Sequence, residues 1–420
     1  METGNEKLET GNRKLEKGKR ELESKGRSLK FLISNFCFLL SSRFHFLISR
    51  FCFLLLSLCL LVSAFCLLLF SFRFAVPVAA ADPPSAEALI DAGHWKRARS
   101  ILEPRVAANP RDAEAACLLS QIKITFGDLD GALKYAQQAL ALDGGSSNYH
   151  FQVAWAYGEM AEKASLFMAA AYARKFKAEL DASLARDPKN MDALEGLMRY
   201  CNEAPRIMGG DKAKAQAIAK ELVQLDPVRG YLAEAELAKE DKDMGKVEEC
   251  FLKAVQADPK SYEAQTTLAN FYTKSPHRKT EAAEKHAGEA VQLHPARAKA
   301  YSILAAVFAL EQRWRELEAV LSASEKNVPD DLAPYFQAAN ALLESGVDLK
   351  RAEAYVRKYL AQEPEGEEPD AAQAHRLLGL ILGKQGRRPE AVSELATAVR
   401  MNPRFKEAKE DLQRLRAGSR

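Results

Sequence analysis

The stretch Ala372–Pro403, AQAHRLLGLILGKQGRRPEAVSELATAVRMNP, decides the fold of this chain. It predicts two helices joined by a tight turn at Gly386, and the second helix ends before Pro403. Small residues such as Gly379 and Ala391 stand where two helices must approach closely, and larger apolar residues fill the space beside them. The stretch therefore predicts a helical hairpin whose two helices pack directly on each other.

The same spacing recurs through residues 82–420. A proline cannot continue a helix, and it biases the residue before it away from the helical region. Prolines that would end helices recur at intervals close to 34 residues. They are Pro110, Pro188, Pro227, Pro259, Pro295, Pro329, Pro364 and Pro403. One is missing between Pro110 and Pro188, where Asp143-Gly144-Gly145 supplies the stop. These intervals predict about nine helix-turn-helix units, followed by a polar amphipathic helix over Phe405–Leu415.

This order of small and large positions resembles the tetratricopeptide repeat (TPR) family. The resemblance implies an all-α fold, a right-handed superhelical solenoid of about nine TPR units with a C-terminal capping helix. It also implies that the first helix of each unit lines a concave groove, and that the chain is a non-catalytic scaffold for a protein or peptide partner. No enzyme activity and no cofactor are expected.

Charge is spread unevenly along the chain. Residues 1–81 hold 12 of the 60 Lys and Arg residues and 6 of the 57 Asp and Glu residues, so the rest of the chain carries a net charge of −3. A non-specific nucleic-acid binder needs a basic face that displaces counterions from phosphates. The sequence therefore predicts no nucleic-acid partner.

Cysteine and histidine offer no metal site in the sequence. Beyond residue 81 the chain holds three cysteines, Cys117, Cys201 and Cys250, which are far apart, and the seven histidines are scattered without paired ligand spacing. We expect the three thiols to be buried apolar groups and predict no bound metal.

The N-terminal part divides into two segments. Residues 1–50 repeat with a period of seven, and we interpret them as a low-complexity segment that is disordered or an over-extended gene start. Residues 51–72 carry no charge and are long enough to span a bilayer, and Ala79 and Ala81 supply a small-x-small cleavage box. Residues 51–81 therefore predict a signal peptide or an uncleaved membrane anchor. Membrane contact is expected only through residues 51–72, if they remain.

Either interpretation exports the third segment, 82–420, to the periplasm or the outside of the cell. The alternative leaves the repeats anchored to the membrane and outside the cytoplasm, as an envelope assembly factor. An organelle transit peptide, an accessory subunit of an enzyme complex and a lattice-forming structural protein also remain open. Units three and four, around Trp155 and Asn190, additionally resemble repeats of exported bacterial TPR proteins.

The positions that line the groove in TPR arrays give the candidate partner-binding residues. Read onto this sequence they are Trp155, Glu195, Arg199, Asn202, Glu203, Asn270, Lys274 and Arg376. The alternative is that the charged residues form a solvated face and that Trp155 belongs to the core. The groove-lining positions offer no set of cations that would clamp the C-terminal carboxylate of a partner.

Two departures from the regular repeat length fall in adjacent units. A long helix is predicted near Ser165–Ala185, and an eight-residue insertion follows at 204–211. Because repeat packing does not require either, we predict that partner binding centres on units three and four. The alternative is that the insertions only fill each other's space and that the loop buries Ile207 and Met208.

Overall fold

A computed structural model describes residues 84–274, 276, 278–366 and 369–417. The described residues belong to the unit Pro84–Arg420. The predictions for residues 1–50 and 51–81 lie outside the described residues. Among the helices described, none is both long and apolar enough to cross a membrane.

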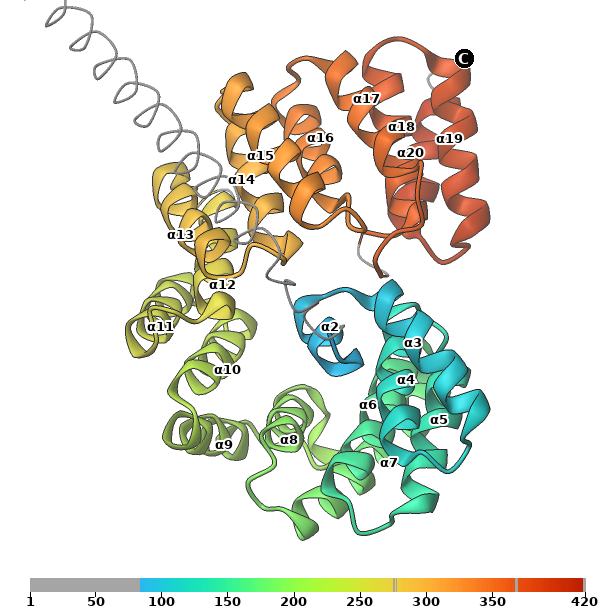
Figure 1. Ribbon diagram of the computed structural model, residues 1–420, viewed down its shortest axis with the longest axis vertical. Coiled ribbons are helices and arrows are strands. Elements are labelled where there is room, and N and C mark those ends of the chain that lie inside the picture. The colour runs from blue at the N-terminus through green and yellow to red at the C-terminus, as the bar shows by residue number, and fades with distance from the viewer. Residues whose placement is uncertain (1–83, 275, 277, 367–368, 418–420) are drawn as a thin grey trace, which may run out of the picture. The chain divides into compact units, whose positions relative to one another are not determined.

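The described residues form α-helices and one short 3₁₀ helix, with no strand among them, which confirms the all-α prediction (Figure 1). The bounds are α2 (Ala86–Ala92), α3 (Trp95–Ala108), α4 (Ala113–Thr125), α5 (Leu129–Leu142), α6 (Ser147–Lys163), α7 (Leu166–Arg186), α8 (Met191–Glu203), η1 (Arg206–Met208), α9 (Lys212–Leu225), α10 (Pro227–Glu240), α11 (Met244–Ala257), α12 (Tyr262–Thr273), α13 (Thr280–Leu293), α14 (Ala298–Leu310), α15 (Trp314–Asn327), α16 (Ala333–Ser345), α17 (Leu349–Tyr359), α18 (Ala371–Lys384), α19 (Arg388–Met401) and α20 (Lys406–Ala417).

Short polar side chains start most of these helices. The first turn of a helix leaves backbone N–H groups without partners, and an Asp, Asn or Ser before it can accept one of them. Asp370 does so for α18 in a full capping box with Gln373. The other N-caps whose side chains accept a backbone N–H are Ser85, Asp112, Asp128, Ser146, Asn190, Asp211, Asp226, Asp243, Ser261 and Asp348.

The hairpin α18–α19 shows how the two helices of a pair approach each other. A methyl group placed on Gly379 would lie 2.7 Å from Cγ of Leu395 and 3.1 Å from the backbone oxygen of Ala391. Ala391 and Leu395 are fully buried. The close approach that the sequence predicts here is therefore present, and it depends on the missing side chain of Gly379.

Successive helices pair from α2–α3 to α18–α19, and α20 follows the last described pair (Figure 1). One apolar core runs without a break from α10 to α19, and a second joins α6 to α10. Helix α20 covers the end of the array, because Ala408 and Leu412 are buried. Each pair thus completes the core of its neighbours, as repeat proteins require.

The first pair also contacts loops more than 200 residues further along. Lys96 forms an ion pair of 3.0 Å with Glu365 and donates to the carbonyl oxygens of Asp330 and Glu363 at 2.7 and 2.6 Å. His94 lies 3.1 Å from the carboxylate of Asp330. Figure 1 shows the α2–α3 turn, in blue, beside loops of the orange helices. Nearest-neighbour packing of repeats does not require these contacts.

Candidate functional site

A groove of about 810 Å³ lies between α6, α7 and α8, and we call it the α6–α8 groove. It is lined by Gln121, Phe151, Trp155, Gly158, Glu159, Ala161, Glu162, Leu166, Ala169, Ala170, Ala173, Phe176, Asp192, Glu195, Gly196, Arg199, Tyr200, Glu203, Ala204, Pro205 and Met208.

The lengths of two helices create this groove. Helix α6 has 17 residues and α7 has 21, whereas α8 has 13 and α9 has 14. The α6–α7 hairpin is therefore longer than α8 and α9, and the first turns of α7 lie along the groove. Leu166, Ala169, Ala170 and Ala173 of this part of α7 line the groove.

Phe176 of α7 forms part of the apolar floor, and two glycines make room for its ring. A methyl group on Gly158 of α6 would lie 3.4 Å from the ring, and one on Gly196 of α8 would lie 3.5 Å from it. The ring also packs against Tyr200, with centroids 6.2 Å apart. The floor is therefore an aromatic side chain held between two small residues.

Trp155 is half-buried on α6, where it lines the groove. Its ring stacks with that of Phe151 at a centroid distance of 6.3 Å, and its indole N–H donates to Glu159 at 3.1 Å. The tryptophan is thus fixed from two sides while part of its surface stays accessible. Such aromatic side chains are favoured at the centres of binding surfaces.

The insertion after α8 folds into η1 and a glycine turn. Gly209 has φ of +97°, and a methyl group on Gly210 would lie 1.7 Å from the backbone oxygen of Ala204, so this backbone requires glycine. The hydroxyl of Tyr200 donates to the carbonyl oxygen of Met208 at 2.5 Å. Ile207 is 95% exposed, so the alternative that the loop buries this side chain is wrong.

The lining carries five carboxylates and one guanidinium: Glu159, Glu162, Asp192, Glu195, Glu203 and Arg199. Arg199 forms an ion pair of 2.8 Å with Glu236 of α10. The groove is therefore acidic, and the charge of the single arginine in its lining is already shared with a further carboxylate.

Arg229 of α10 pairs with two of these carboxylates from outside the lining. It bonds Glu195 at 2.7 Å and Asp192 at 2.6 Å. Burial opposes the charge of Arg229, but the hydrogen bonds to Glu195 and then to Asp192 outweigh it and raise its pKa. These three groups form a structural ion-pair network between α8 and α10.

Two other carboxylates have no such partner among the interactions described. Burial and then the negative charges of Glu236 and Glu162 raise the pKa of Glu203. Burial and then the negative charge of Glu159 raise the pKa of Glu162. Both pKa values are raised because the carboxyl groups are partly buried and lie near other carboxylates, with few cations nearby.

The structure brings four of the eight predicted residues into this one groove: Trp155, Glu195, Arg199 and Glu203. Asn202 is half-buried on α8 and lies outside the lining. Asn270 and Lys274 are exposed at the end of α12. Arg376 of α18 bonds Asp411 of α20 at 2.7 Å, so it holds the terminal helix.

Sequence reasoning missed the contribution of α7. Phe176 and the alanines of its first turns belong to the second helix of a unit, which is not the helix that lines the groove in regular TPR arrays. The unusual predicted length of this helix was the available signal.

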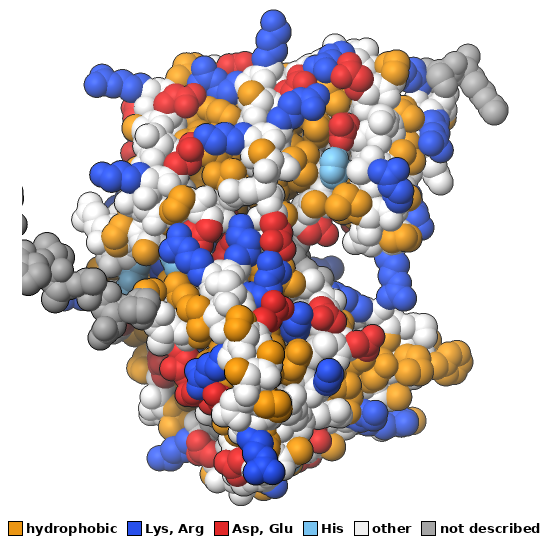
Figure 2. Space-filling model, turned by 45° about the vertical axis from the view of Figure 1, so that its right-hand side comes forward, with side chains coloured by type: hydrophobic (Ala, Val, Ile, Leu, Met, Phe, Trp, Pro, Cys, Tyr) orange, Lys and Arg blue, Asp and Glu red, His pale blue; other side chains and the backbone are white. Residues whose placement is uncertain are grey.

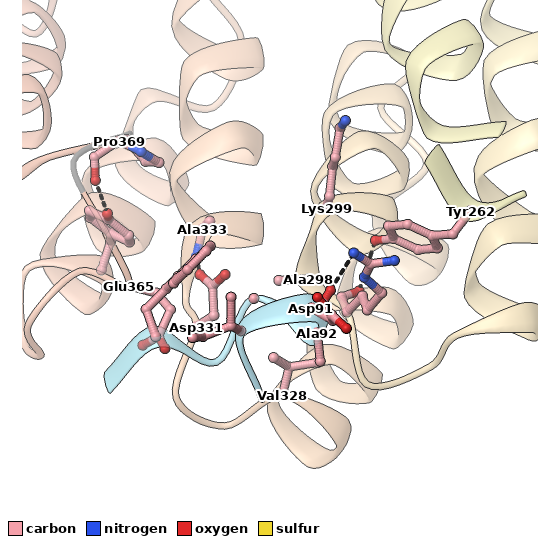
Figure 3. Close-up of a pocket in the computed structure, with 15 residues that line it drawn as sticks. Asp91, Ala92, Tyr262, Ala298, Lys299, Val328, Asp331, Ala333, Glu365 and Pro369 are labelled. Atoms are coloured by element: carbon pink, nitrogen blue, oxygen red, sulfur yellow. Dashed lines mark hydrogen bonds between the residues drawn. The ribbon is translucent and has the colours of Figure 1, made fainter. Parts of the chain in front are cut away.

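A second cavity, of about 270 Å³, lies where the first pair meets the later loops (Figure 3). Glu365 and Asp331 lie toward one end of it, and Tyr262 and Lys299 toward the other. Glu365 is 9% exposed and already paired with Lys96, while the guanidinium of Arg297 stacks over Tyr262 and donates to the carbonyl oxygen of Asp91. The charged groups of Glu365 and Arg297 thus serve the contact itself.

No group of histidine, cysteine and carboxylate side chains in the described part of the chain could hold a metal ion. Cys117, Cys201 and Cys250 are buried free thiols, as expected. Burial raises the pKa of Cys117 to about 12, which makes its thiolate inaccessible at neutral pH. Figure 2 shows basic and acidic side chains mixed over the face drawn.

Paired helices packed in series define a helical-repeat solenoid. A family model described as the tetratricopeptide repeat matches residues 85–147 and 336–404. These two stretches are tetratricopeptide repeats, and a protein-interaction scaffold is the general role of proteins that carry such repeats. No curated protein sequence matches the chain.

Several solved structures are similar to the chain at low identity. Yeast Tom70 is 14% identical, with a TM-score of 0.44, over 80% of this chain and 87% of that one. A tetratricopeptide repeat protein from Parabacteroides merdae is 18% identical, with a TM-score of 0.42, over 62% and 98%. TTC0263, a TPR protein from Thermus thermophilus, is 18% identical, with a TM-score of 0.40, over 45% and 96%.

Proposed function

We propose that this protein is a non-catalytic scaffold that holds a peptide segment of a partner protein in the α6–α8 groove. The observation that supports this most is the groove itself, because its apolar floor is set by an extension of α7 that repeat packing does not need. Trp155 and Phe176 offer the fixed aromatic surface on which a peptide side chain can pack. We expect no bond-making step.

A matched pair of alanines on α7 tests the site. Ala170 lines the groove and Ala171 does not, so Ala170→Gln places a neutral side chain in the groove and Ala171→Gln places the same side chain outside it. Peptides are selected from a random library on the purified full-length protein. We expect the selected peptides to lose about tenfold or more in affinity for Ala170→Gln and for Trp155→Ala.

Binding to Ala171→Gln should equal that of the wild type. Circular dichroism melting of each variant establishes that it is folded. Selected peptides that bind Ala170→Gln and the wild type equally would contradict the proposal, and so would a selection that yields no binder.

We also propose that the scaffold acts outside the cytoplasm, as an exported periplasmic or secreted protein. The uncharged run 51–72 and the cleavage box at Ala79–Ala81 support this. If the run stays uncleaved, the same scaffold becomes a membrane-anchored assembly factor of the envelope. Protease treatment of intact cells or spheroplasts tests export, and repeats that stay protected until lysis of the inner membrane would contradict it.

A further inference from the structure

Carboxylates flank the apolar floor of the α6–α8 groove on both sides. Glu159 and Glu162 come from α6, and Glu203 comes from α8. A peptide segment that packs on this floor therefore has carboxylates on both sides. A cationic side chain on the segment would stabilise binding, and an anionic one would weaken it.

The protein itself supplies little positive charge to offset this. Arg199 is the single cation in the lining described, and it is shared with Glu236. Burial and mutual repulsion oppose the ionised forms of Glu203 and Glu162. A lysine or arginine of a bound segment would relieve that repulsion, whereas an acidic segment would increase it.

Large apolar side chains stand exposed at the rim. Leu166 and Phe167, at the start of α7, are 84% and 89% exposed, and Ile207 in η1 is 95% exposed. Leu166 also belongs to the lining. Exposed apolar side chains next to an apolar groove extend the surface on which a partner can pack.

We propose that the α6–α8 groove selects a partner segment in which lysine or arginine residues flank at least one large apolar side chain. This rests on the proposed function, which it deepens by naming the chemistry of the partner. The apolar side chain packs on Trp155 and Phe176, and the cations meet the carboxylates of α6 and α8.

The test uses two synthetic peptides of about twelve residues, which span at most about 40 Å when fully extended. One alternates Lys with Leu and Ala, and the other has Glu at every Lys position. Binding of each labelled peptide to the full-length protein is measured by fluorescence anisotropy at about 50 and about 300 mM salt. We expect the basic peptide to bind more tightly, and we expect salt to weaken its binding.

Charge-neutralising variants locate the effect. Glu162→Gln and Glu203→Gln should each weaken the basic peptide by about two- to fivefold, the range for partly exposed ion pairs. Glu281→Gln removes an exposed carboxylate on α13, away from the lining, and should leave the affinity of the basic peptide unchanged. Ala170→Arg adds a cation to the groove and should weaken binding of the basic peptide more than either glutamine variant.

The outcomes separate this inference from the proposed function. If the acidic peptide binds as well as or better than the basic one and loses affinity for Ala170→Gln, the groove binds peptides but the charge preference is wrong. If the basic peptide binds all variants equally, both the charge preference and the proposed function of the groove are wrong. If the protein self-associates and Ala170→Gln abolishes this, a second copy occupies the groove and the inference is overturned.

Discussion

At the scale of single residues, the contact between α18 and α19 depends on two small side chains. Gly379 leaves room for Leu395 and for the backbone of Ala391, and Ala391 is itself fully buried. The partners of Arg199 and Arg376 were not predictable, because each ion pair joins different helices at geometry that only the fold sets.

Gly379→Ala should lower the free energy of unfolding by about 1–3 kcal/mol, because the added methyl group meets Leu395 and the backbone of Ala391. Chemical denaturation measures the change. The control is Gly288→Ala in α13, where a methyl group meets nothing within 4 Å. That variant should instead gain up to about 1 kcal/mol from helix propensity, and an equal loss in both variants would contradict the packing.

Asp112 gives a prediction for pH. A hydrogen bond from the backbone N–H of Ala115, and then one from Arg105, lower the pKa of this N-cap below its ordinary value of 3.8. A carboxylate with a lowered pKa stabilises the fold above its unfolded pKa, and this stabilisation is lost as the pH falls through the folded pKa.

The stability advantage of the wild type over Asp112→Asn should therefore be full near neutral pH and shrink as the pH falls below about 4. Denaturation curves at several pH values test it. An advantage that grows as the pH falls would contradict the assignment.

At the scale of helices, pairing and ends follow from proline, glycine and capping residues, so they could be read from the sequence. The long α7 was also expected, but the place of Phe176 beside Gly158 and Gly196 was not, because these glycines lie on two other helices. The α7 wall of the groove therefore became visible only in the structure.

Removal of residues 404–420 should expose the apolar face that Ala408 and Leu412 of α20 cover. It also leaves Arg376 without its 2.7 Å partner Asp411. We expect the truncated protein to unfold at lower denaturant and to self-associate, because terminal repeats need a polar cap. Sedimentation measures the second effect. A truncated protein that remains monomeric and equally stable would show that α20 is not a cap.

At the scale of the repeat array, the contacts of the first pair with later loops are the feature that sequence reasoning did not predict. His94 and Asp330 are 236 positions apart, and their meeting depends on small rotations accumulated over all the repeats between them. No local pattern encodes that sum. Repeat identity could thus be predicted from the sequence, whereas the closure of the array could not.

Lys96 makes several of the contacts of this closure. Its substitution by Met removes the ion pair to Glu365, a carboxylate whose pKa is raised by burial, and the bonds to two loop carbonyl oxygens. Amide hydrogen exchange in α2 and α3 should become faster in Lys96→Met, because the buried carboxylate of Glu365 loses its partner and the contact weakens. Lys260→Met, at an exposed loop position, should leave the exchange unchanged. Identical exchange in the two variants would refute the role of Lys96.

Photo-cross-linking tests most directly the claim that the α6–α8 groove is the binding site. A benzophenone-bearing form of the basic peptide is irradiated with the full-length protein, and mass spectrometry maps the modified residues. We expect modification within residues 151–176 and 192–208, with the signal lost in Ala170→Gln and kept in Ala171→Gln. Modification concentrated on α12, around Asn270 and Lys274, or spread evenly along the array would contradict it.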